Sequence, residues 1–188
     1  MKKVGILALQ GDFAAHEAAV VRAGGAALLV RAARQFGEID GLIIPGGESS
    51  TMLRLLHYDN LMQPLAQFAR EKQVFGTCAG VILLAKTVTS PAQESLAAMD
   101  VDVERNAYGR QNESRIVAIE PEADMGADKF EAVFIRAPII RRAGASVKIL
   151  ARYNGDPVLV EQGLHMGATF HPELTTDTRV HARFLAKL

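Results

Sequence analysis

The sequence predicts an α/β fold: an open, mostly parallel sheet with helices on both faces and an antiparallel extension. Three observations predict it. In the first half of the chain, short apolar runs alternate with helical patterns, and glycine-bearing turns join them. Those runs are apolar throughout, which is typical of strands buried on both faces of a parallel sheet. The second half holds strand-like runs with few helices between them.

The first half supplies the parallel part of the sheet. Four apolar runs are expected to form strands, at residues 4–9, 26–30, 39–44 and 74–76. Asp12 is placed to cap the helix after the first strand, and Gly24-Gly25 ends that helix. Between these signals, residues with helical spacing are Phe13, Ala14, Glu17, Ala18 and Val21.

Three more helices are expected in the first half. One begins with Ser49 or Ser50 as its cap and runs through Tyr58. The others cover residues 61–72 and 81–86, the last directly after the fourth strand. The alternation of strand and helix favours right-handed crossovers.

The second half supplies the antiparallel extension. Strands are expected at residues 96–103, 116–119, 133–135, 147–153 and 158–161, and a closing helix at 176–188. No repeat, low-complexity tract or linker interrupts the pattern. We therefore expect one domain over residues 1–188, a length typical of a single domain.

Composition and charge exclude several classes of protein. Hydrophobic residues make up 49% of the 188, which excludes wholesale disorder. Basic and acidic residues number 21 each, so the formal net charge is zero. They are also balanced locally, with 9 basic and 8 acidic groups in residues 1–94 and 12 and 13 in residues 95–188. Without a basic patch, nucleic acid is not an expected partner.

The cysteine count and the apolar runs predict the compartment. A lone cysteine forms no intramolecular disulfide and suits a reducing compartment. The apolar run near the N-terminus, at residues 4–9, is too short for a signal peptide. No stretch approaches the 18 apolar residues of a membrane span, so the expected location is the cytoplasm, with no membrane partner.

The lone cysteine lies in a nucleophile elbow. Gly76-Thr77-Cys78-Ala79-Gly80 stands where the fourth strand gives way to a helix, as the G-x-S-x-G elbow does with serine. The nucleophile occupies a strained turn there, and side chains two residues away on either side would clash. The following helix also favours the thiolate. A buried structural cysteine is the alternative, but the flanking glycines favour a nucleophile.

A histidine and a glutamate supply the base that a cysteine nucleophile needs. They lie in Phe170-His171-Pro172-Glu173. On an extended segment, residues two apart point to the same side, so His171 and Glu173 are expected to be neighbours. The carboxylate would then fix the tautomer of the imidazole.

Glycines after the third strand suggest an oxyanion hole. Pro45-Gly46-Gly47-Glu48-Ser49 closes that strand and opens a helix, where backbone amides are free to bind an anion. We expect the N–H groups of Gly47 and Ala79 to form the hole. Gln10, after the first strand, should lie at the same edge of the sheet, where sites of open α/β sheets gather.

The remaining histidines predict no further site. His16, His57 and His181 fall on expected helices and are interpreted as facing solvent, and His165 as structural. The sequence has no CxxC or HxxxH pattern, so no metal site is predicted. It has no GxGxxG or Walker A motif either.

Taken together, these motifs resemble those of class I glutamine amidotransferases, and among them the glutaminase subunits of pyridoxal 5′-phosphate synthase. The resemblance runs from residue 4 to residue 188. Many amidotransferases share its glycine motifs, and its specific segments are Val103-Glu104-Arg105-Asn106, which Gly109-Arg110-Gln111 follows, and Phe134-Ile135-Arg136-Ala137-Pro138.

The resemblance implies a class I glutamine amidotransferase-like fold and hydrolysis of L-glutamine by a Cys78–His171–Glu173 triad. It implies substrate contacts by Gly47, Glu48, Ser49, Arg105, Ile135 and Arg136. Two arginines suit an α-carboxylate, and Glu48 suits an ammonium group. The implied partner is a (β/α)-barrel synthase subunit that receives the ammonia. Pyridoxal phosphate would be a product of that complex, so no cofactor of this chain is expected.

Two other interpretations remain open from the residues alone. One is a different enzyme on the same elbow, either a glutaminase for another synthase or a cysteine peptidase. The other is a binding module without catalysis, which would have no need of all three triad residues.

Overall fold

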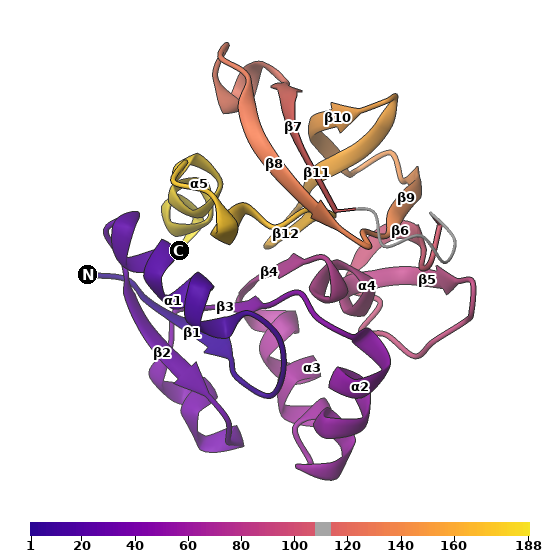
Figure 1. Ribbon diagram of the computed structural model, residues 1–188. Helices are drawn as coiled ribbons and strands as arrows, with labels where there is room; N and C mark the ends of the chain where they lie inside the picture. The colour runs from indigo at the N-terminus through magenta and orange to yellow at the C-terminus, as the bar shows by residue number, and fades with distance from the viewer. Residues whose placement is uncertain (108–113) are drawn as a thin grey trace.

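The computed structural model describes residues 1–107 and 114–188 (Figure 1). The motif Gly109-Arg110-Gln111 lies outside the described residues. Within them, the larger sheet has nine strands in the order β2-β1-β3-β4-β12-β11-β10-β7-β8. The predicted class, a mostly parallel sheet continued by antiparallel strands, is confirmed.

Five strands form the parallel part of the sheet: β1 (Lys3–Leu7), β2 (Ala26–Val30), β3 (Gly41–Ile44), β4 (Gln73–Thr77) and β12 (His165–Ala168). The first four match the expected strands. The fifth comes from the far end of the chain and pairs with β4, so that Gly167 lies beside Gly76 and Ala168 beside Thr77. This pairing joins the two halves of the sequence at the centre of the sheet.

The antiparallel part continues from β12 through β11 (Asp156–Gln162), β10 (Lys148–Tyr153), β7 (Ser114–Pro121) and β8 (Phe130–Ile135). All four were expected. The observed β7, β8 and β11 extend beyond the apolar runs that predicted them, whereas β10 begins one residue later than its run. Polar residues at the strand ends extend the pairing, as in the register of Ser114 against Ile135.

Helices cover both faces of the parallel part (Figure 1). On one face, α1 (Phe13–Arg22) and α5 (Arg179–Lys187) pack over a buried cluster that includes Ile6 and Ile43. On the other, α2 (Ser49–Tyr58), α3 (Met62–Glu71) and α4 (Ala79–Leu84) pack over Leu7 and Ile44. Adjacent residues of one strand thus enter different cores, because successive side chains point to opposite faces. Because both faces of these strands are buried, the strands are apolar throughout.

A smaller sheet holds β5 (Ala85–Thr89), β6 (Met99–Glu104) and β9 (Ile139–Ala143). The expected helix over residues 81–86 is wrong at its end, since α4 stops at Leu84 and Lys86 lies in β5. Ser95 stabilises this strand start, because its hydroxyl donates to the carbonyl of Ala85 at 2.7 Å. The short turns η1 (Ala33–Glu38), η2 (Ala123–Met125) and η3 (Pro172–Leu174) complete the elements.

Two histidines expected at the surface are buried. His16 on α1 is 0% exposed and His181 on α5 is 1% exposed, whereas His57 faces solvent as expected. The face of α1 was misjudged: Val21 is 59% exposed, and the helix buries His16, Ala19 and Val20 instead. Spacing of i, i+3 and i+4 identifies that face, but only if a histidine is accepted as a core residue.

The cap of α2 also differs from the expectation. Glu48, rather than Ser49 or Ser50, occupies the cap position, and its carboxylate accepts hydrogen bonds from the N–H groups of Ser50 and Thr51. These bonds outweigh the effect of partial burial and lower the pKa of Glu48 to about 2. None of the helices in the described residues, α2 included, is long and apolar enough to cross a membrane.

Candidate active site

A cavity of about 240 Å³ opens at the carboxyl edge of the parallel strands. Eight of the ten predicted site residues line it: Gly47, Glu48, Ser49, Cys78, Arg105, Ile135, Arg136 and His171. The other two are buried close by in the chain: Ala79 directly follows Cys78, and Glu173 lies two residues after His171. The structure therefore gathers residues from distant parts of the sequence around one small cavity.

Cys78 stands in a strained turn between β4 and α4. Its φ of 48° and ψ of −103° lie in a region that side chains rarely adopt. A Cβ on Gly76 would lie 2.4 Å from the carbonyl carbon of Gly80, and one on Gly80 would lie 2.1 Å from the carbonyl oxygen of Ile44. Both glycines are thus required by close backbone contact, as the elbow pattern predicts.

Gly80→Ala is expected to destabilise the protein, because the new methyl group would meet the rigid backbone of β3. Overpacking of this kind costs about 1–3 kcal/mol of unfolding free energy, and backbone contact places Gly80 at the upper end. Gly37→Ala is the matched control, since a Cβ there meets nothing within 4 Å. Urea unfolding of both variants measures the difference, and equal unfolding free energies would contradict the steric account of the elbow.

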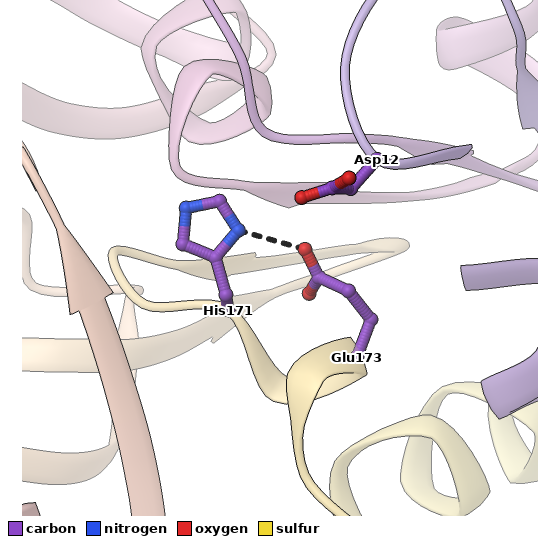
Figure 2. Close-up of side chains that lie close together, drawn as sticks. All are labelled: Asp12, His171 and Glu173. Carbon is purple, nitrogen blue, oxygen red and sulfur yellow. Dashed lines mark hydrogen bonds and ion pairs between the residues drawn. The ribbon is translucent and has the colours of Figure 1, made fainter. Parts of the chain in front are cut away.

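His171 and Glu173 form a close pair at the end of β12 (Figure 2). Nδ1 of His171 lies 2.7 Å from Oε1 of Glu173, and both side chains are buried. The backbone between them forms the turn η3 rather than the extended segment that was expected. The pairing was predicted correctly, but a short turn produces it.

The charge on His171 follows from its two neighbours. Burial lowers its pKa, but hydrogen bonds to Cys78 and Glu173, together with the negative charges of these groups, outweigh burial and raise the pKa of His171 to about 10. Because this exceeds the ordinary value of 6.5, protonation of His171 stabilises the fold fully below about pH 6.5. That contribution is lost as the pH rises through about 10.

The two glycines after β3 lie against the site on one side and against Gln10 on the other. A Cβ on Gly46 would lie 2.3 Å from Cε1 of His171, and one on Gly47 would lie 2.4 Å from Nε2 of Gln10. Oε1 of Gln10 also accepts a hydrogen bond from the N–H of Glu48 at 3.0 Å. Gln10 is therefore at the expected edge and in contact with the glycine turn after β3.

Two predicted charged residues meet at the cavity wall. Nη2 of Arg105 lies 3.6 Å from Oε1 of Glu48 and donates to Oγ of Ser50 at 2.7 Å. The Arg105 side chain is 11% exposed, so it is held within the site rather than spread on the surface. The Glu48 carboxylate, which caps α2, is also a wall of the cavity.

The remaining predicted contacts come from β8 and α2. Sγ of Cys78 lies 3.9 Å from the carbonyl oxygen of Ile135, at the end of β8. Arg136 follows with a φ of 44° and is exposed. Ser49 is 3% exposed, and its hydroxyl donates to Oε1 of Gln93 at 3.0 Å.

Sequence reasoning missed six residues that line the cavity: Gly11, Asp12, Gly46, Ile82, Asn106 and Pro138. Asp12 is the most informative of them, because it was interpreted only as a helix cap. Within the described residues its side chain makes no cap hydrogen bond, and it points toward His171 and Glu173 instead (Figure 2). Its place after the first parallel strand is the signal that identifies it.

Asp12, His171 and Glu173 also place potential metal-ligand atoms within 4.8 Å of one another. The 2.7 Å separation between Nδ1 of His171 and Oε1 of Glu173 fits a shared proton. Two atoms bound at about 2.0–2.2 Å to one tetrahedral zinc ion would lie farther apart. The geometry favours a hydrogen-bonded relay at this position.

Comparison with known proteins identifies a family for this chain. The model of the SNO glutamine amidotransferase family matches residues 6–188. The chain belongs to this family. The matched segment of this chain contains the elbow, the glycine turn after β3 and the buried His–Glu pair.

Two relatives of the SNO family member described here are pyridoxal 5′-phosphate synthase subunits PdxT. The one from Solibacter usitatus is 59% identical, with all of both chains covered. The one from Koribacter versatilis is 52% identical and covers 97% of this chain and 94% of its own. A crystal structure of a glutamine amidotransferase is 44% identical, covers 98% of this chain and 97% of its own, and superimposes with a TM-score of 0.89.

Proposed function

We propose that this chain hydrolyses L-glutamine to L-glutamate and ammonia, as the glutaminase subunit of a pyridoxal 5′-phosphate synthase. One observation carries the proposal: a cysteine in a strained elbow shares a cavity with a histidine that a buried glutamate orients. Family membership and the names of the PdxT relatives support the same activity. Cys78, His171 and Glu173 are the proposed catalytic residues.

The proposed reaction passes through a thioester. The Cys78 thiolate attacks the carboxamide carbon, and the oxyanion is stabilised by the backbone N–H groups of Gly47 and Ala79. Ala79 is the first residue of α4, so its N–H has no acceptor within the helix. Protonated His171 gives its proton to the departing ammonia. Neutral His171 then activates water, which cleaves the thioester, releases glutamate and restores the thiolate.

The charged ends of glutamine match the walls of the cavity. Arg105 and Arg136 are the proposed partners of the α-carboxylate, and Glu48 of the α-ammonium group. Ser49 and the backbone at Ile135 complete the proposed contacts. A cavity of about 240 Å³ accommodates a single amino acid such as glutamine.

The proposed partner is the (β/α)-barrel subunit that uses the ammonia. Its support is the resemblance of the motifs and the printed name of the relatives, which calls them synthase subunits. We place the reaction in the cytoplasm, because its nucleophile is an unpaired thiol that a reducing compartment preserves. A glutaminase for another ammonia-using synthase would be activated by a different synthase subunit.

The isolated chain is expected to be a poor glutaminase that its partner activates. The peptide between Gly46 and Gly47 carries a proposed oxyanion donor and can rotate without a side-chain clash. Gln10, which is half-buried and does not line the cavity, contacts this hinge, and we place the docking of the partner near it. Restoring one donor is expected to raise kcat about 10²–10³-fold.

Steady-state glutaminase assays, with the chain alone and then titrated with synthase subunit, measure this activation. Gln10→Ala should reduce it, whereas Gln67→Ala, on the exposed face of α3, should leave it unchanged. Equal kcat/KM with and without the partner would contradict the gate. Full activation of Gln10→Ala would remove Gln10 from it.

A further inference from the structure

Behind the active site, four polar side chains form a buried row. Nε2 of His16 lies 3.0 Å from Oγ1 of Thr77 and 3.3 Å from Oε2 of Glu173. On the other side of the ring, Nδ1 of His16 lies 3.1 Å from Nε2 of His181. None of the four residues is more than 3% exposed. They come from α1, β4, η3 and α5, so the row ties both termini of the chain to the proposed triad.

The second oxygen of Glu173 identifies what this row does. Its first oxygen, Oε1, is bonded to His171. Oε2 is buried and, among the residues that the structure describes, makes no hydrogen bond of regular geometry. A buried carboxylate oxygen without a donor is costly. The N–H position of His16, 3.3 Å away, is placed to satisfy it.

The tautomers of the two histidines decide which nitrogen donates and which accepts in each hydrogen bond of this row. If Nδ1 of His16 carries the proton, its Nε2 lone pair faces Oε2 of Glu173, and His181 must carry a proton on Nδ1. Within the described residues that nitrogen is buried without a partner. If Nε2 of His16 carries the proton instead, the N–H is shared between Thr77 and Glu173, and His181 donates to Nδ1 of His16. The second arrangement leaves fewer buried groups unsatisfied.

We propose that His16 is a positioning residue, whose Nε2–H holds Oε2 of Glu173 so that Oε1 stays aligned with His171. This inference rests on the proposed glutaminase function. His181 fixes the tautomer of His16 from behind. His16 does not line the cavity, and of its two partners on the side of the triad, Thr77 and Glu173, we assign its effect to Glu173.

Burial, more than neighbouring charge, keeps this donor neutral. Burial, then the positive potentials of His181 and His171, lower the pKa of His16 well below its ordinary value. Burial, aided by Arg22, lowers the pKa of His181 to about 4. A neutral donor orients Glu173 without competing with His171 for its negative charge. Asp12 and Cys78 are the other ionisable groups at the front of the triad.

A matched pair of substitutions tests the proposal in the chain assembled with its synthase subunit. The amide nitrogen of glutamine reaches as far from the backbone as Nε2 of histidine, whereas that of asparagine reaches only as far as Nδ1. His16→Gln should therefore keep kcat near the wild-type value. His16→Asn should lower kcat about tenfold, the rate equivalent of losing one hydrogen bond to a charged group.

Three further readouts separate positioning from packing. In His16→Asn, KM for glutamine should stay unchanged, and the alkaline limb of the kcat/KM profile should move to lower pH, because a misaligned Glu173 raises the pKa of His171 less. In a Glu173→Gln background, His16→Asn should have no additional effect on kcat. Equal kcat for folded His16→Asn and His16→Gln, or additive losses with Glu173→Gln, would overturn the proposal.

A second pair covers the case in which His16→Asn fails to fold. His181→Gln keeps the donor to His16 and should retain activity, whereas His181→Leu frees the His16 tautomer and should lower kcat with unchanged KM. Equal activity of these two variants would overturn the role given to His181 and to the tautomer. A wild-type complex that releases no glutamate would instead contradict the proposed function itself.

Discussion

Cys78→Ala is expected to abolish glutamine hydrolysis while leaving the fold intact. Removing a triad nucleophile costs on the order of 10⁶ in kcat. The fold should survive, because the turn at Cys78 strains alanine no more than cysteine. The contacts that Sγ makes with His171 and, at 3.9 Å, with the carbonyl oxygen of Ile135 belong to the site rather than to the core. Glutamate release by the complete complex measures the loss, and thermal unfolding of the variant checks the fold.

Ser146→Ala is the matched control, because it removes one polar atom from an exposed loop beyond the cavity. It should leave kcat unchanged. Substantial glutamate release by folded Cys78→Ala would reject the nucleophile assignment. It would leave Cys78 as a structural thiol in an elbow that binds but does not react.

His171→Asn is expected to be almost as damaging, with a loss on the order of 10⁶ in kcat. The asparagine amide occupies the position of Nδ1, so it can still donate to Glu173 and satisfy that buried carboxylate. It cannot reach Cys78 or carry a proton to the leaving ammonia. Glutamate release and thermal unfolding, measured on the same samples, separate lost chemistry from lost structure.

Glu173→Gln should be milder than His171→Asn, with a loss of about 10⁴, because the base remains but is held in the wrong tautomer. A variant of Glu173 that is fully active would remove it from the relay. A larger loss than that of His171→Asn would mean that Glu173 takes part in the reaction itself, rather than orienting the base.

The parts of the site that the sequence predicts are those encoded over a few residues. The elbow requires glycines two positions either side of Cys78, and the backbone contacts of Gly76 and Gly80 show why. His171 and Glu173 are two residues apart, so almost any local backbone keeps them close. Strands β1 to β4 are apolar throughout, because both faces of the sheet are covered by helices.

The parts that were misjudged depend on contacts between distant segments. His16 is a core residue only because Thr77, Glu173 and His181 supply its polar partners, and none of these is near it in sequence. Strand β5 is a strand because β6 pairs with it, although its sequence continues a helical pattern. Asp12 faces the triad because β1 and β12 end at the same edge.

The central position of β12 governs when this protein can become active. Its partners, β4 and β11, are both made earlier by the ribosome, and each has an open edge until residues 165–168 enter between them. Exposed strand edges invite pairing with other chains, so the nascent protein is at greatest risk of aggregation just before its last segment emerges. In the proposed mechanism, the same order keeps incomplete chains from releasing ammonia, because His171 and Glu173 follow the strand that completes the sheet.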